Sequence, residues 1–254
     1  MTIRGGQPEL LRGIIFDLFG TLIVPDRFEE TNIAHLLEWA AVRGLPVSPD
    51  ATQVVEEAST WMWQETRLTG RQVLRSEALA RAADQLGWPT EEAFLTEATR
   101  VFFTPEVGTV RAYPDAVTSL EALGQMGLRL GLISIASDHG LVEQVLHRTG
   151  LAPYLDPVVS SAAFGRVKPD PGIFRFVLER WGSPPEQCVM VGDTLDADIE
   201  GAQALGMRAI LVTMDPNPNN ARVADRIRPD ATAATLEQAV QIIRTWTGHP
   251  EPGA

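Results

Sequence analysis

The sequence contains only one cysteine and only one lysine. Because Cys188 is alone, one chain cannot form a disulfide framework, nor a zinc or iron–sulfur site built from several thiolates. Basic residues are also few: 21 lysine and arginine residues stand against 33 aspartate and glutamate residues, which gives a net charge of −12. Nucleic acids and anionic membranes both attract proteins with a basic surface, so the negative net charge argues against binding to either.

Long apolar stretches are missing as well. No segment approaches the roughly 20 apolar residues of a membrane span, and residues 1–6 do not lead into the apolar core of a signal peptide. We therefore expect a cytoplasmic protein with no membrane partner, present as a monomer or a homodimer. The 254 residues, 44% of them hydrophobic, suffice for one large or two modest domains.

Lys168 is exceptional because it is the one lysine, and all the other lysine-plus-arginine residues are arginines. A compact ammonium group fits a tight site beside a carboxylate or a phosphoryl oxygen, where a planar guanidinium does not. Lys168 is therefore a candidate functional residue.

Short apolar segments alternate with segments of helical periodicity. The apolar segments cover residues 13–16, 128–133, 157–159, 188–191 and 208–212, and the helical ones cover 115–126, 141–148, 172–181, 199–205 and 236–246. Nearly continuous apolar strands are typical of a parallel sheet that is covered on both faces. The sequence therefore predicts an α/β fold, a doubly wound parallel sheet of the Rossmann-like kind.

Residues 25–105 have a different pattern, with four helical segments and no convincing strand. The helical segments cover 29–42, 49–68, 73–86 and 90–103, and short breaks between them favour antiparallel neighbours. We predict an all-helical cap domain over residues 25–105, inserted into a core that consists of residues 1–24 and 106–254.

Polar residues directly follow three of the predicted strands. They are Asp17, Ser134 and Asp193, and Lys168 precedes the helix after the third strand. Ligands of an open parallel sheet bind at the carboxyl ends of its strands, so these side chains form the candidate site. An aspartate there can act as a nucleophile, and converging carboxylates need a divalent cation such as Mg²⁺ or a lysine between them.

The motifs at these positions resemble those of the haloacid dehalogenase-like hydrolase superfamily, and the resemblance covers essentially the whole chain. Four signatures occur in order: residues 16–22 (FDLFGTL), Ser134, Lys168-Pro169, and Gly192-Asp193 followed by residues 198–202 (DIEGA). The predicted helical insert also stands where that superfamily places its cap.

This resemblance implies roles for individual residues. Asp17 is the implied nucleophile, and Ser134 and Lys168 are the implied catalytic groups that bind the transferring group. The implied Mg²⁺ ligands come from the first and last motifs: Asp17, the Phe19 carbonyl, Asp193 and Asp198. The substrate contacts predicted in the core are Thr21, Ser134, Ile135 and Lys168.

Two positions depart from the superfamily pattern. At Phe19, phosphatases of the superfamily usually carry a second aspartate that protonates the leaving group, and loss of a positioned acid typically costs about 10²–10⁴-fold in rate. Ile135 stands where asparagine is common. His139 is one candidate for a replacement proton donor, although a solvated loop histidine is the simpler interpretation.

The missing acid is compatible with a 2-haloacid dehalogenase, because halide leaves without a proton and that branch has an aromatic residue at this position. Other features of the branch are absent: Phe174 replaces its tyrosine, no arginine clamp occurs early in the cap, and Gly192-Asp193 is intact. We therefore predict an Mg²⁺-dependent phosphohydrolase that acts on a small, anionic phosphorylated metabolite through an aspartyl-phosphate intermediate. The alternatives are a metal-independent 2-haloacid dehalogenase with Asp17 as nucleophile, and a catalytically silent phosphometabolite-binding or partner protein.

Specificity is expected on the cap, which carries four of the six tryptophans. Trp63 and Arg67 are four residues apart in a predicted helix and so lie on one face, where they would suit an aromatic or anionic substrate. We expect most of the other tryptophans to pack inside the helical bundle.

Overall fold

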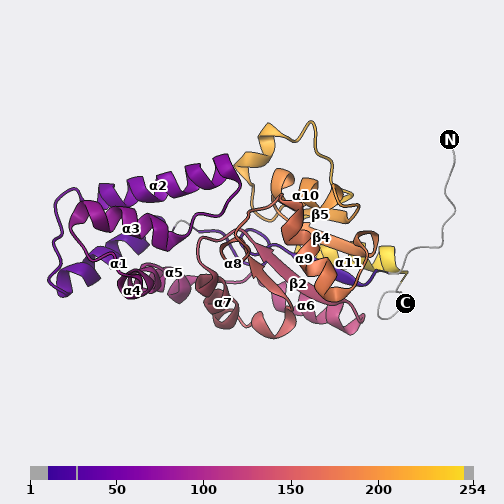
Figure 1. The fold of residues 1–254 in the computed structure, drawn as a ribbon. Coiled ribbons are helices and arrows are strands. Elements are labelled where there is room, and N and C mark those ends of the chain that lie inside the picture. The colour runs from indigo at the N-terminus through magenta and orange to yellow at the C-terminus, as the bar shows by residue number, and fades with distance from the viewer. Residues whose placement is uncertain (1–10, 27, 249–254) are drawn as a thin grey trace.

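The computed structural model describes residues 11–26 and 28–248, in which six parallel strands form one sheet of order β3-β2-β1-β4-β5-β6 (Figure 1). The strands are β1 (Gly13–Phe16), β2 (Arg129–Ser134), β3 (Val158–Ser160), β4 (Cys188–Gly192), β5 (Arg208–Val212) and β6 (Ala231–Ala233). The chain runs outward from β1 to β3 and returns to β4 on the other side of β1, so the strand order reverses there. The predicted doubly wound, Rossmann-like α/β fold is confirmed.

Both faces of the sheet are buried. Ile14 and Phe16 of β1 belong to one apolar core and Ile15 to another, because successive side chains of a strand point to opposite faces. Helices α6 (Ala116–Gln125), α7 (His139–Arg148) and α11 (Leu236–Thr247) contribute to the first core, whereas α9 (Pro171–Trp181) and α10 (Glu200–Gln203) contribute to the second. Burial on both faces explains why the strands are nearly continuous apolar segments.

Five helices between β1 and α6 lie to one side of the sheet and form a helical insert (Figure 1). They are α1 (Glu29–Val42), α2 (Ala51–Thr69), α3 (Arg75–Leu86), α4 (Glu92–Phe102) and α5 (Thr104–Thr109). Helix α2 packs along α3, and α1 packs against α2, α4 and α5. Within the ranges that the structure describes, no helix combines the length and the apolar composition needed to cross a membrane.

The remaining elements are short. They are α8 (Ser161–Phe164), the π-helix η3 (Leu195–Ile199), and the 3₁₀ helices η1 (Ala152–Tyr154), η2 (Pro185–Gln187) and η4 (Pro218–Arg222). Like α8 and the 3₁₀ helices, β6 and α5 lie where no helix or strand was predicted. Strand β6 has only three residues and no apolar run, and α5 has only six residues. The predicted cap boundary at residue 105 falls inside α5, which packs against both α1 and α7. The division into two domains therefore stays a prediction.

Backbone hydrogen bonds between described residues join the helical insert to the rest of the fold at two places. At the chain connections, Val24 N–H donates to the Arg111 carbonyl at 3.0 Å, and Tyr113 N–H donates to the Leu22 carbonyl at 3.0 Å. At the other place, the turn between α2 and α3 meets loops that follow β2 and β3. The Arg75 N–H donates to the Ser137 carbonyl at 2.9 Å, and Val167 N–H donates to the Gly70 carbonyl at 3.1 Å.

Candidate active site

The candidate active site lies at the carboxyl ends of β1, β2 and β4. Asp17 follows β1, Ser134 is the last residue of β2, and Asp193 follows β4. Strands β1 and β4 are neighbours at the point where the strand order reverses. An open α/β sheet binds ligands in the crevice outside such a point, so the topology itself brings Asp17 and Asp193 together.

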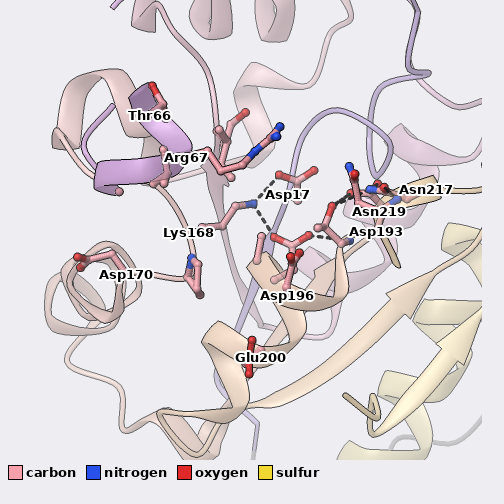
Figure 2. Close-up of a pocket in the computed structure, with 18 of the residues that line it drawn as sticks. Asp17, Thr66, Arg67, Lys168, Asp170, Asp193, Asp196, Glu200, Asn217 and Asn219 are labelled. Carbon is pink, nitrogen blue, oxygen red and sulfur yellow. Dashed lines mark hydrogen bonds and ion pairs between the residues drawn. The ribbon is translucent and has the colours of Figure 1, made fainter. Parts of the chain in front are cut away.

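Lys168 lies between two carboxylates at the bottom of the site (Figure 2). Its Nζ is 2.6 Å from Asp17 Oδ1, 2.6 Å from Asp198 Oδ1 and 2.9 Å from the Ile133 carbonyl oxygen, to which it donates a hydrogen bond. Burial alone would favour the neutral amine, but the two carboxylates outweigh it and raise the pKa of Lys168. The ammonium therefore stays charged and fixes the orientation of Asp17.

Asp193 is held by neutral hydrogen-bond donors. Its Oδ2 accepts a hydrogen bond from Asn217 Nδ2 at 2.8 Å, and its Oδ1 accepts one from the Thr194 hydroxyl at 3.1 Å. The Asn220 amide donates to the Asp193 main-chain carbonyl at 2.8 Å. Burial, together with the nearby charge of Asp17, raises the pKa of Asp193 to about 6 although these donors oppose the shift.

Asp198 is fully buried in the π-helix η3, which turns its carboxylate back toward β4. Its Oδ2 accepts a hydrogen bond from the Thr194 N–H at 3.1 Å. A Cβ atom on Gly192 would lie only 2.4 Å from the Asp198 carboxyl carbon, so the last residue of β4 has to be glycine. Burial raises the pKa of Asp198, and the neighbouring carboxylates add to this shift while Lys168 opposes it.

Asp17, Asp193 and Asp198 form an acidic cluster that suits a divalent cation. One carboxylate oxygen from each lies within 4.8 Å of the other two. Three carboxylates beside one ammonium group leave two negative charges when all are ionised, and the two positive charges of Mg²⁺ would balance them. Oxygen atoms are also the ligands that Mg²⁺ prefers. Asp196, by contrast, is exposed and stands apart from this cluster.

A cavity of about 900 Å³, here called the reaction cavity, opens above the acidic cluster. Every residue predicted for the site lines it except Thr21, namely Asp17, Phe19, Trp63, Arg67, Ser134, Ile135, Lys168, Asp193 and Asp198. The Ser134 Oγ is buried and has no hydrogen-bond partner among the described residues, so a hydroxyl is available to a ligand. Thr21 is also buried without a partner for its hydroxyl, but its contact with substrate stays a prediction.

The two predicted substrate contacts of the helical insert lie near the end of α2. Trp63 is 38% exposed, whereas Trp88 is buried and Trp39 and Trp61 are partly buried in the apolar core. Figure 2 shows the Arg67 side chain directed into the cavity, toward Asp17. Trp63 is thus the tryptophan of the insert that is available to a ligand.

A second cavity of about 420 Å³, here called the side cavity, adjoins the first and shares Phe19, Trp63 and Ile135 with it. Neither cavity is lined by His139, whose Nδ1 is 2.9 Å from the Ser160 hydroxyl and whose Nε2 is 3.7 Å from a Glu143 carboxylate oxygen. These contacts give no support to His139 as a proton donor for the substrate.

The asparagines that hold the last motif in place were not among the residues predicted for the site. Asn217 and Asn220 both donate hydrogen bonds to Asp193 from the loop that follows β5. Asn220 Oδ1 also accepts a hydrogen bond from the Leu195 N–H at 2.8 Å. The density of asparagine and proline in this segment was the available signal.

The fold is that of a known enzyme family. A model of the haloacid dehalogenase-like hydrolases matches residues 11–206, and the chain belongs to that family of hydrolases. It is similar to a glyceraldehyde 3-phosphate phosphatase of Methanocaldococcus jannaschii, with 28% identity over 92% of this chain and 98% of the relative. It is 29% identical to a phosphoserine phosphatase of Thermus thermophilus, over 74% of this chain and 77% of the relative.

Among solved structures, the chain is similar to a 2-haloacid dehalogenase from Pseudomonas syringae pv. Tomato DC3000. The TM-score is 0.73 and the sequence identity 27%, and the match covers 93% of this chain and 100% of the other. Phosphatases and a dehalogenase thus both occur among the similar proteins.

Proposed function

We propose that the protein is an Mg²⁺-dependent phosphohydrolase that acts on a small phosphorylated metabolite through an aspartyl-phosphate intermediate. The acidic cluster of Asp17, Asp193 and Asp198 carries this proposal, because a hydrolase that displaces halide has no use for a divalent-cation site. The phosphatase names of the two relatives above support the same reaction class.

In the proposed reaction, Asp17 attacks the phosphorus atom. Lys168 donates to Oδ1 of this carboxylate, and Oδ2 accepts no hydrogen bond within the described residues and can attack. As the phosphorus–oxygen bond to the leaving group breaks, the Lys168 ammonium and the Ser134 hydroxyl stabilise charge on the transferring group. Water then hydrolyses the aspartyl phosphate and regenerates Asp17.

A bound Mg²⁺ would neutralise charge on the phosphoryl oxygens and orient the group relative to Asp17. Asp17, Asp193 and the Phe19 main-chain carbonyl would hold the ion, with Asp198 in support. The raised pKa of Asp193 agrees with a site that has an excess of negative charge when no cation is bound.

The Phe19 side chain cannot protonate a leaving group. A substrate with a stable leaving anion, such as an acyl or aryl phosphate, avoids this requirement because its oxygen leaves without a proton. We propose that residues 25–105 act as a cap that closes over this chemistry and excludes water, with Trp63 and Arg67 in contact with the substrate.

The test is the hydrolysis of acyl, aryl and alkyl phosphates with Mg²⁺ or with EDTA, by the wild type and by Asp17→Asn. The proposal requires phosphate release that depends on both Mg²⁺ and Asp17, and that is fastest for the best leaving groups. Binding of phosphate esters without any turnover would instead support a silent binding protein.

A second candidate is a 2-haloacid dehalogenase, favoured by Phe19 and by the similarity to the Pseudomonas structure. In that reaction Asp17 displaces halide from carbon, and no proton is needed by the leaving group. Halide release from 2-haloacids that EDTA does not affect would establish this candidate and overturn the first.

A further inference from the structure

Four arginines line the reaction cavity outside the acidic cluster. Arg67 comes from α2 and Arg222 from η4, and the other two are Arg166 and Arg226. Outside the acidic cluster, the cavity is lined by three carboxylates: Asp170, Asp196 and Glu200. In a chain with a net charge of −12, this part of the cavity is therefore more basic than the protein as a whole.

Two of the four arginines already have carboxylate partners. Arg166 Nε is 3.0 Å from Asp170 Oδ2, and Arg226 forms an ion pair with Glu200. For Arg67 and Arg222, in contrast, residues 11–26 and 28–248 provide neither an ion pair nor a hydrogen bond to the guanidinium group. Two guanidinium groups that line one cavity are thus available to an anion.

The two available arginines belong to different parts of the molecule. Arg67 lies in the last turn of α2, and Arg222 is the last residue of η4, on the loop that follows β5. Figure 1 shows η4, coloured gold, beside the C-terminal end of α2. An anion between these two side chains would contact the helical insert and the sheet at the same time.

The size of the cavity leaves room for such a group. Lys168 and Ser134, the proposed ligands of the transferring phosphoryl group, are both buried at its base. A volume of about 900 Å³ is in the range that encloses an entire small-molecule ligand rather than one phosphoryl group. Arg67 and Arg222 line the same cavity.

We propose that the substrate carries a second anionic group, a carboxylate or a second phosphate, and that Arg67 and Arg222 bind it. This inference rests on the proposed phosphohydrolase function. Guanidinium groups recognise both anions through paired, charge-assisted hydrogen bonds, and a planar fork does this better than an ammonium group. Each arginine acts on substrate affinity and not on the bond that breaks.

The test measures, by calorimetry, how tightly probe molecules bind to the Asp17→Asn variant. This variant lacks the nucleophile, so turnover does not contribute to the measurement. The probes are linear alkyl phosphates of two to six carbons that end in methyl, carboxylate or a second phosphate. At one chain length or more, a probe with an anionic end is expected to bind at least 10-fold more tightly than its methyl counterpart. The better of the two anionic ends identifies the second group as carboxylate or phosphate.

Further substitutions assign this preference to the two side chains. Arg67→Met and Arg222→Met should each remove most of the preference, Arg67→Lys should retain part of it, and Arg175→Met, on an exposed face of α9 outside the cavity, should not change it. Equal binding of all three ends at every length, or a preference that survives both methionine substitutions, would overturn the inference. Because binding is measured without turnover, failure of the proposed hydrolysis appears separately, as absence of phosphate release by the wild type.

Discussion

Among the residues that the structure describes, two cations are buried beside carboxylates, one next to the sheet and one inside the helical insert. Lys168 is paired with Asp17 and Asp198 at 2.6 Å each. Arg75 is 2% exposed, and its two terminal nitrogens each lie 3.3 Å from one carboxylate oxygen of Glu29. The Cζ atom of Arg75 lies 4.2 Å from the centre of the Phe102 ring, over which the guanidinium group stacks. Both clusters therefore combine a buried cation with acidic partners.

The clusters differ in how their charge is balanced. Around Lys168, a third carboxylate, Asp193, has only neutral donors and is left for an external cation. Near Arg75, the second acidic residue is Glu106, which accepts a hydrogen bond from Asn32 at 3.0 Å and whose pKa is raised to about 7 by burial. The insert can thus neutralise its excess charge by binding a proton, whereas the active-site cluster suits a metal ion.

The largest expected effect comes from removal of one carboxylate in each cluster. Asp17→Asn should lower phosphate release by roughly 10⁴-fold or more, because the nucleophile is lost. Glu29→Gln should change the rate only a few-fold, since Glu29 contacts Arg75 and not the reacting atoms. Steady-state kinetics with one aryl phosphate measure both, and equal losses in the two variants would contradict the distinction between the clusters.

Removal of either cation should lower the stability, but only removal of Lys168 should also abolish the activity. Lys168→Met leaves the buried carboxylates of Asp17 and Asp198 without a cation, which typically costs about 3–5 kcal/mol. Arg75→Met should cost less, because its partner Glu29 is 42% exposed and stays hydrated. Only Lys168→Met should also abolish phosphate release. Urea unfolding and kinetics of the folded fraction measure the two effects.

Arg43→Met is the matched control for these two variants. Arg43 is 47% exposed in its ion pair with Glu97, so its loss should cost no more than about 1 kcal/mol. An Arg75→Met variant that folds but loses as much activity as Lys168→Met would place Arg75 in the reaction and remove the contrast.

Mg²⁺ should stabilise only through the cluster at the sheet. A ligand present at 100 times its dissociation constant stabilises the native state by about 2.7 kcal/mol, so Mg²⁺ should raise the unfolding temperature of the wild type. Asp193→Asn should remove this increase, whereas Arg75→Met should keep it. Thermal unfolding with Mg²⁺ or EDTA is the measurement, and a wild type that does not respond to Mg²⁺ would contradict the proposed metal site.

The two clusters also differ in how far the sequence predicts them. Asp17, Ser134 and Asp193 follow strands whose apolar pattern is clear, so their convergence could be predicted from the rule for parallel sheets. Nothing in the helical periodicity of residues 73–86 marks Arg75 as buried, because its burial depends on how α1, α2 and α4 pack around it. The contact of Asn217 with Asp193 spans 24 residues and depends on the path of a loop, which no periodicity records.

The smallest expected effect is a pH dependence of stability from Glu106. Its pKa of about 7 in the folded protein exceeds the ordinary value of 4.5, so the folded state binds the proton more tightly than the unfolded state. Stability from this group is therefore fully present below about pH 4.5 and is lost as pH rises through 7, by about 2 kcal/mol between pH 5 and pH 8.

Glu106→Gln keeps the size of the side chain and removes the titration. Asn32 Nδ2 can still donate to the oxygen of the new amide, so the contact seen at 3.0 Å can be retained. Asp193 and Asp198 also have raised pKa values and act in the same direction, but they are present in both proteins and cancel in the difference. Urea unfolding from pH 5 to pH 8 should therefore show the variant losing less stability than the wild type, and parallel curves would mean that the insert does not bind this proton.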